Sequence, residues 1–134
     1  MKIQYASDLH LEFPDNTCFL RTNPIIPVGD ILVLAGDIGL LDDDTFCSHT
    51  FWDWTSDNFK QTLVIPGNHE FYKSGDVGTI KNGCIVEIRP NVKCYYNAVV
   101  SEPPFPLFCS TFSCQLSLLK KVFGIASKRD FPAI

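Results

Sequence analysis

Three short apolar runs dominate the first half of the 134-residue chain, and each is followed at once by polar, chemically capable residues. The runs cover residues 3–7, 31–35 and 63–66, and the residues that follow them include Asp8 and His10, Gly36 and Asp37, and Gly67 to Glu70. The second and third runs are apolar at nearly every position, which is typical of strands buried on both faces of a sheet. The pattern therefore predicts an α/β fold, in which further layers cover both faces of the sheet.

The segment between the second and third runs has the length of a helix. Residues 42–61 carry Phe46, Thr50 and Trp54 at intervals of four, and the acidic residues 42–44 suit the positive end of a helix dipole. A strand, a helix and a strand in this order favour a right-handed crossover between parallel neighbours. The polar residues would then gather at the carboxyl ends of the strands, where open α/β sheets bind ligands.

The second half of the chain predicts shorter elements. A polar segment over residues 71–83 reads as a loop with a short helix. Candidate strands and a candidate amphipathic helix follow, at residues 84–87, 92–96, 107–112 and 113–127 respectively. The chain contains no internal repeat or interdomain linker, so we expect a single domain over residues 1–134.

Five polar side chains at the three predicted strand ends suit a metal site: Asp8, His10, Asp37, Asn68 and His69. Asp8 and His10 are two residues apart, so in an extended segment both side chains point to the same side. Asp37 follows a glycine, and its carboxylate could use both oxygens to bridge two ions. Carboxylate, imidazole and amide oxygens together suit divalent Mn, Fe or Zn.

Each of these residues alone has an ordinary structural reading, as a loop residue, a turn residue or a helix cap. Their combination at three strand ends favours a metal site over those readings. Glu70 and Tyr72 are interpreted as structural residues, and His49 as a residue of the crossover helix that lies away from the strand ends.

The order of the motifs resembles that of the calcineurin-like metallophosphoesterases. The resemblance rests on Asp8-x-His10, Gly36-Asp37 and Gly67-Asn68-His69-Glu70, and it is strongest over residues 1–72. It implies a four-layer α/β/β/α sandwich, with two mixed sheets packed face to face and helices outside. The implied activity is hydrolysis of phosphate monoesters or diesters with two divalent metal ions.

The resemblance also implies a role for each candidate residue. Asp8 and His10 would bind the first metal ion, Asp37 would bridge both ions, and Asn68 would bind the second. His69 would act on the substrate, by protonating the leaving group or by stabilising the charge of the phosphoryl group.

The family completes its site with further histidines after these motifs, including a Gly-His-x-His segment. This chain has three histidines, His10, His49 and His69, so the second metal site is expected to be incomplete. We expect the chain to be the N-terminal portion of such an enzyme, with its sandwich incomplete at the C-terminus. The alternative is a degenerate, non-catalytic scaffold that binds at most one metal ion or a protein partner.

The composition also bears on nucleic-acid binding, disulfide bonds and membrane spans. The net charge is −4 and basic residues gather only in two short pairs, which argues against an extended nucleic-acid groove, although metal ions alone can hold a short phosphodiester. Six cysteines without a C-x-x-C pair predict free thiols in a reducing cytoplasm. No apolar run is long enough to span a membrane. We expect a cytoplasmic protein, and the family resemblance implies a phosphate-ester substrate.

Overall fold

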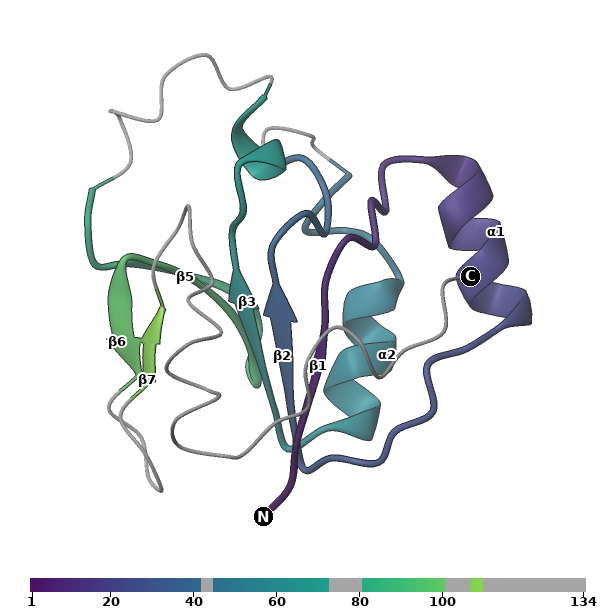
Figure 1. Cartoon of the computed structure of the whole chain (residues 1–134), viewed down its shortest axis with the longest axis horizontal. Helices are drawn as coiled ribbons and strands as arrows, with labels where there is room; N and C mark the ends of the chain where they lie inside the picture. Colours follow the sequence, from purple (N-terminus) through teal and green to yellow (C-terminus); the bar gives the residue numbers. More distant parts are fainter. Residues whose placement is uncertain (42–44, 73–80, 101–106, 110–134) are drawn as a thin grey trace, which may run out of the picture.

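The computed structural model describes residues 1–41, 45–72, 81–100 and 107–109 (Figure 1). Its elements are β1 (Ile3–Ala6), α1 (Pro14–Thr22), β2 (Ile31–Ala35), α2 (Phe51–Asn58), β3 (Gln61–Ile65), the 3₁₀ helix η1 (His69–Phe71), β4 (Cys84–Arg89), β5 (Val92–Tyr96), β6 (Ala98–Val100) and β7 (Leu107–Cys109). The three predicted strands of the first half are confirmed, as are the strands predicted near residues 84, 92 and 107. The helix predicted over residues 113–127 lies outside the described residues.

Five strands form one mixed sheet in the order β1-β2-β3-β5-β4. The first four of these neighbours run parallel, and β4 pairs antiparallel with β5 through a register shift near Arg89. Because β1, β2 and β3 are parallel, their carboxyl ends lie along one edge of the sheet. The predicted strand–helix–strand unit with parallel neighbours is confirmed, since α2 lies between β2 and β3 in the chain, and its right-handedness stays a prediction.

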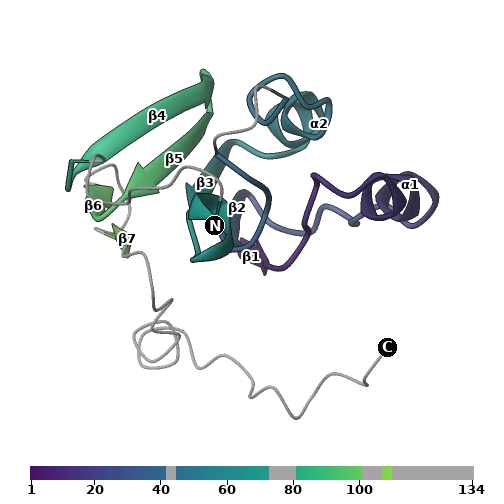
Figure 2. The ribbon, with the colours of Figure 1, turned by 90° about the horizontal axis from the view of Figure 1, so that it is seen from above.

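The central strands β2 and β3 are buried on both faces, which explains their continuous apolar runs. Leu32, Leu34 and Val64 belong to a core cluster shared with α2, whereas Val33 and Leu63 belong to a second cluster shared with β6. Viewed along the strands, α2 and the antiparallel β6–β7 pair lie on opposite sides of the sheet (Figure 2). The described residues thus form an α/β fold that supplies three successive layers of the predicted α/β/β/α sandwich: helix, sheet and sheet.

The crossover helix is shorter than predicted, and its buried face differs. Residues 45–48 form turns, and α2 begins only at Phe51, whose backbone N–H donates to Nδ1 of His49 at 3.1 Å. This later start changes which side chains face the sheet, so Thr50 is exposed and Trp54 only half-buried. The helix instead buries Phe51, Trp52 and Thr55. The predicted i, i+4, i+8 line was wrong because its members do not belong to one helix.

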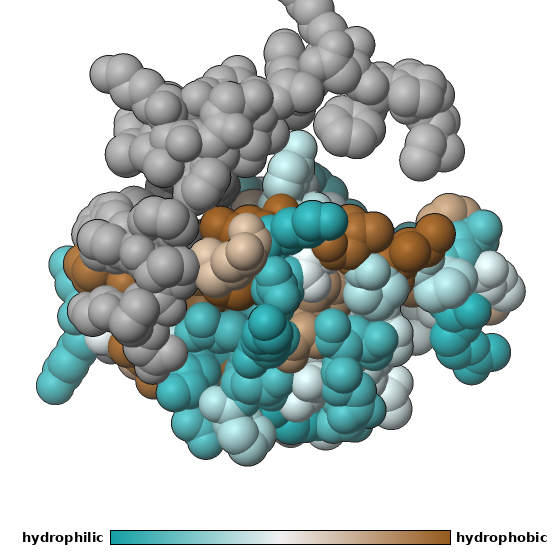
Figure 3. All heavy atoms as spheres, turned by 90° about the horizontal axis from the view of Figure 1, so that it is seen from below, coloured by the Kyte–Doolittle hydropathy of each residue, from teal (hydrophilic) through white to brown (hydrophobic). Residues whose placement is uncertain are grey.

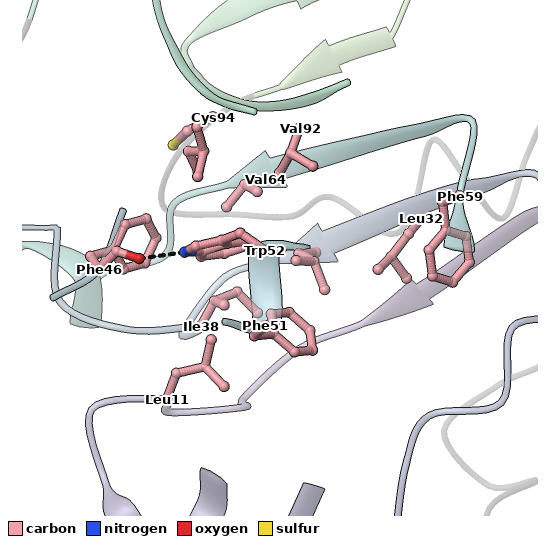
Figure 4. Packing of buried hydrophobic residues seen from close by; sticks show 12 residues of the cluster. Leu11, Leu32, Ile38, Phe46, Phe51, Trp52, Phe59, Val64, Val92 and Cys94 are labelled. Carbon is pink, nitrogen blue, oxygen red and sulfur yellow. Dashed lines mark hydrogen bonds between the residues drawn. The ribbon is translucent and has the colours of Figure 1, made fainter. Parts of the chain in front are cut away.

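Trp52 anchors α2 to the rest of the core. Its side chain is fully buried, and its indole N–H donates to the backbone carbonyl of Phe46 in the preceding turn (Figure 4). The rings of Phe46 and Phe51 lie 5.0 and 5.5 Å from that of Trp52. The predicted burial of Phe46 and Phe59 is confirmed.

Helix α1 was not anticipated by the sequence. It has no buried residue, although Leu20 packs against the core cluster that contains α2. Because no residue of α1 is buried, its sequence needs no wide apolar stripe, which is the usual indication of a helix. Pro14 at the start of α1 is the clearest local indication of this helix.

The amino ends of the strands are tied together by one carboxylate. Asp30 precedes β2, accepts a hydrogen bond from the backbone N–H of Lys2 at 2.8 Å, and pairs with the Lys60 ammonium at 2.8 Å. The Lys60 hydrogen bond is the main reason that the pKa of Asp30 lies below its usual value. Seen from this side, the molecule presents a largely polar face with apolar residues along one margin (Figure 3).

Two further findings concern the cysteines and the lengths of the helices. The described cysteines Cys18, Cys47, Cys84 and Cys94 are all free thiols. Neither α1 nor α2 is long and apolar enough to cross a membrane, and the same holds for every helix among the described residues.

We expect Trp52→Ala to lower the free energy of unfolding by about 3–5 kcal/mol, because it leaves a large cavity under α2. Trp54→Ala, two residues away on the same helix, is the matched control and should cost on the order of 1 kcal/mol. Urea denaturation of the two variants measures both values. Equal losses would mean that α2 does not have the observed buried face.

Candidate metal centre

The segments that follow β1 and β2 run side by side beyond the sheet. Three backbone hydrogen bonds of 2.8–3.1 Å join them, from the N–H groups of Asp8, His10 and Leu11 to the carbonyl oxygens of Gly36, Asp37 and Ile38. The two segments therefore continue the parallel pairing of their strands. This pairing brings the polar residues that follow β1 next to those that follow β2.

The ends of β2 and β3 approach each other at two glycines. A Cβ atom at Gly36 would lie 3.1 Å from the Cα of Gly67, and Gly36 also has a φ of 92°, which favours glycine. A Cβ atom at Gly67 would lie 2.5 Å from Oδ1 of Asp37. Both glycines are therefore required for the close approach that the sequence predicted beside Asp37.

Glu70 holds these two strand ends together. Its side chain is 1 % exposed, and its two carboxylate oxygens accept three backbone N–H groups. The Ile38 N–H donates to Oε1 at 2.6 Å, and those of Asp37 and Gly67 donate to Oε2 at 3.0 and 2.7 Å. The predicted structural role of Glu70 is confirmed, since the buried carboxylate satisfies donors that would otherwise be lost at the strand ends.

The candidate ligands sit on strained backbone. Among the described residues, four other than glycine have a positive φ, and three of them are Asp8 (59°), His10 (47°) and Asp37 (58°). The left-handed conformation is unfavourable for residues with a Cβ atom, and it persists only where the surrounding structure imposes it. Such strain concentrates at functional sites, and here it coincides with the residues that the sequence predicted as metal ligands.

Asp8, His10 and Asp37 converge to form one potential coordination group. One ligand atom from each lies within 4.8 Å of the other two. Ligands on opposite sides of one ion lie about 4 Å apart, because metal–oxygen and metal–nitrogen bonds are each about 2 Å long. The donor set and its spacing thus fit a divalent cation.

Asn68 and His69 follow Gly67, at the end of β3. The His69 backbone N–H donates to Oδ1 of Asp37 at 3.2 Å, which places this turn directly beside the coordination group. The Asn68 amide nitrogen donates to the Tyr72 hydroxyl at 2.6 Å. That hydrogen bond leaves the carbonyl oxygen of Asn68 as its metal-ligating atom, and its role as a ligand stays a prediction.

Glu12 is a residue of the site that the sequence analysis missed. It forms a second potential coordination group with His10 and His69, again with one ligand atom of each within 4.8 Å of the others. Burial by itself raises the pKa of Glu12. The net pKa nevertheless lies below its usual value, because the carboxylate accepts hydrogen bonds from its own backbone, from His69 and from His10, and because it is attracted to the charge on His69. The signal was available, because Glu12 follows His10 at the same two-residue spacing that links Asp8 to His10.

His49 lies apart from both groups, as predicted, although it precedes α2 instead of lying within it. Its Nε2 is 3.3 Å from the hydroxyl of Thr17 in α1, and its Nδ1 accepts the N–H of Phe51. Burial lowers the pKa of His49. These contacts give His49 a structural role between the two helices.

Comparison with known proteins identifies one family. The family model described as calcineurin-like phosphoesterase matches residues 1–124. No curated protein and no solved structure matches the chain.

We expect Glu70→Gln to lower the free energy of unfolding by about 2–3 kcal/mol, because an amide supplies one acceptor oxygen where the carboxylate supplies two. Glu87→Gln is the matched control, since the Glu87 side chain is 62 % exposed and pairs with Lys93 only at 3.7 Å. Urea denaturation compares the two variants. A Glu70→Gln protein as stable as the control would contradict the role of this carboxylate.

Proposed function

Since this chain belongs to the calcineurin-like phosphoesterase family, we propose that it hydrolyses phosphate esters at a site for two divalent metal ions. The proposal is carried by one observation: ligand atoms of Asp8, His10 and Asp37, from two different strand ends, lie within 4.8 Å of one another. Manganese, iron and zinc are the ions that fit carboxylate and imidazole ligands best.

In the proposed site, Asp8 and His10 would hold the first ion, Asn68 would offer a carbonyl oxygen to the second, and Asp37 would be shared between the two ions. When bound, the ions would polarise the phosphoryl oxygens and lower the pKa of an attacking water toward about 7. The left-handed backbone at Asp8, His10 and Asp37 supports these assignments, because strain of this kind orients side chains before a ligand binds.

His69 is proposed to act on the substrate by protonating the leaving group or by stabilising the phosphoryl charge. Its backbone hydrogen bond to Asp37 keeps the imidazole close to the ligand that would bridge the ions. A positioned acid contributes about 10²–10⁴-fold to the rate of such a reaction.

The substrate is proposed to be a phosphate monoester or diester. A long nucleic acid is disfavoured by the net charge of −4, because extended phosphate backbones are bound by clustered Lys and Arg residues. That residues 1–134 form the N-terminal portion of a single domain of this family, and that the protein is cytoplasmic, both stay predictions.

A second candidate function is a non-catalytic scaffold that binds at most one ion or a protein partner. It is favoured by the histidine count, because His10 and His69 are the only imidazoles in the described site and the chain has no histidine after position 69. With Asp37 shared between two ions, the described residues would offer the second ion few other ligands.

We expect the purified chain with Mn²⁺ to hydrolyse an activated aryl phosphate, and Asp37→Ala to lower the rate by at least about 10²-fold through loss of the bridging carboxylate. His69→Ala should lower it by about 10²–10⁴-fold. Asp57→Asn, an exposed carboxylate on α2, is the control and should leave the rate unchanged. Turnover is followed by release of the coloured phenolate, and equal rates in all four proteins would refute catalysis by this chain.

Metal stoichiometry separates the two functions. The enzyme predicts close to two Mn²⁺ ions per chain after dialysis, and the scaffold predicts one or none. Elemental analysis with a protein assay measures the ratio, and Asp8→Asn should reduce it by about one ion because a carboxylate is the stronger ligand for a hard cation. A wild-type chain that retains no ion would count against the enzyme.

A further inference from the structure

One carboxylate oxygen contacts both histidines of the metal centre. Oε1 of Glu12 lies 3.3 Å from Nδ1 of His10 and 2.5 Å from Nε2 of His69. The two rings meet edge to face, with their centroids 4.4 Å apart. Glu12 thus joins a residue that follows β1 to a residue that follows β3.

This geometry fixes which ring nitrogens carry protons. An ionised carboxylate can only accept hydrogen bonds, so the nitrogen that faces it in each ring must carry the proton. In a neutral imidazole, the other nitrogen then presents its lone pair. For His10 that nitrogen is Nε2, whose lone pair suits a metal ion. For His69 it is Nδ1, which carries a proton only in the imidazolium form and can then donate it to a leaving group.

We propose that Glu12 is a positioning residue that orients both histidines at once, directing Nε2 of His10 to the metal ion and Nδ1 of His69 to the substrate. The roles of the two histidines rest on the proposed function, whereas their orientation by Glu12 does not depend on it. Carboxylates that accept the second N–H of a ligating histidine fix its tautomer and its ring orientation in other metal sites.

The burial of Glu12 supports a positioning role. Its side chain is 9 % exposed, so the carboxylate cannot turn freely toward solvent. Its second oxygen, Oε2, is buried and accepts no hydrogen bond from the described residues. The contacts of Oε1 with the two imidazoles therefore fix how this carboxylate lies among the described residues.

The test uses the metal-free protein and its histidine side-chain NMR spectrum. The chain has three histidines, so a ¹⁵N–¹H correlation spectrum of the imidazole rings gives three sets of signals. Replacing each histidine in turn by glutamine assigns these signals. At about pH 8.5, His10 should carry its proton on Nδ1 and His69 on Nε2, because these are the nitrogens that face the Glu12 carboxylate. In Glu12→Leu both histidines should change to mixed tautomers, while His49 should keep its spectrum because Thr17 and Phe51 hold it.

The test includes a control variant, and a second Glu12 variant in case the first does not fold. Asp15→Asn removes an exposed carboxylate from the first turn of α1 and should leave all three spectra unchanged. If Glu12→Leu does not fold, Glu12→Gln preserves the shape of the side chain and should weaken the tautomer preference of both rings. Wild-type tautomers at His10 and His69 in every folded Glu12 variant would overturn the proposal.

Metal binding provides the second measurement. Calorimetric titration with Mn²⁺ should give an affinity about 10–100-fold weaker in the folded Glu12 variant than in Asp15→Asn. Equal affinities would overturn the link to the metal ion. A wild-type protein with the expected tautomers but no phosphoesterase turnover would refute the proposed function and leave the positioning role of Glu12 standing.

Discussion

The buried carboxylate of Glu70 is the group on which the geometry of the metal centre depends. It accepts N–H groups from the segments that follow β2 and β3, and so links them beyond Ala35 and Ile65, the last paired residues of these two strands. Because it is an acceptor only, it suits a place where backbone donors converge. Without it, the turns that carry Asp37 and His69 would lose the connection that holds them side by side.

The two ends of the sheet use carboxylates for different purposes. At the amino ends, Asp30 links the segments that precede β1, β2 and β3 on a polar, exposed face, where ion pairs contribute little to stability. At the carboxyl ends, Glu12 and Glu70 are buried and accept specific hydrogen bonds. The first arrangement holds strands in register, and the second positions side chains for a ligand.

The left-handed backbone at Asp8, His10 and Asp37 persists because the surrounding structure is well packed. Continuous hydrophobic clusters cover both faces of β2 and β3, and the paired backbones of the two loops leave little freedom to relax. The left-handed backbone therefore places donors close together before any cation is bound. A cation would offset the mutual repulsion of Asp8 and Asp37, which links metal binding to the stability of these loops.

The sequence by itself determined the strands and the place of the site. The uninterrupted apolar runs ending at Ala35 and Ile65 favoured buried parallel strands, and parallel strands bring the polar residues that follow them to the same end of the sheet. Strand direction brought Asp8, His10 and Asp37 to the same end of the sheet. Their spacing depends on left-handed backbone at all three residues, whereas the sequence analysis expected an extended segment at Asp8 and His10. The identity of the family was likewise readable from the order of the motifs.

Only the tertiary structure decided where α2 begins, which of its side chains are buried, and which groups Glu12 and Glu70 contact. Helix α2 starts at Phe51 because turns precede it and because the Phe51 N–H donates to the His49 ring. These contacts involve only a few residues, so they leave no periodic pattern in the sequence. The contacts of Glu12 with His10 and His69 join segments 57 residues apart, from Glu12 to His69, and a linear pattern carries no information about such a distance. Sequence periodicity reports which face of an element is buried, whereas hydrogen bonds between distant loops exist only once the sheet has brought those loops together.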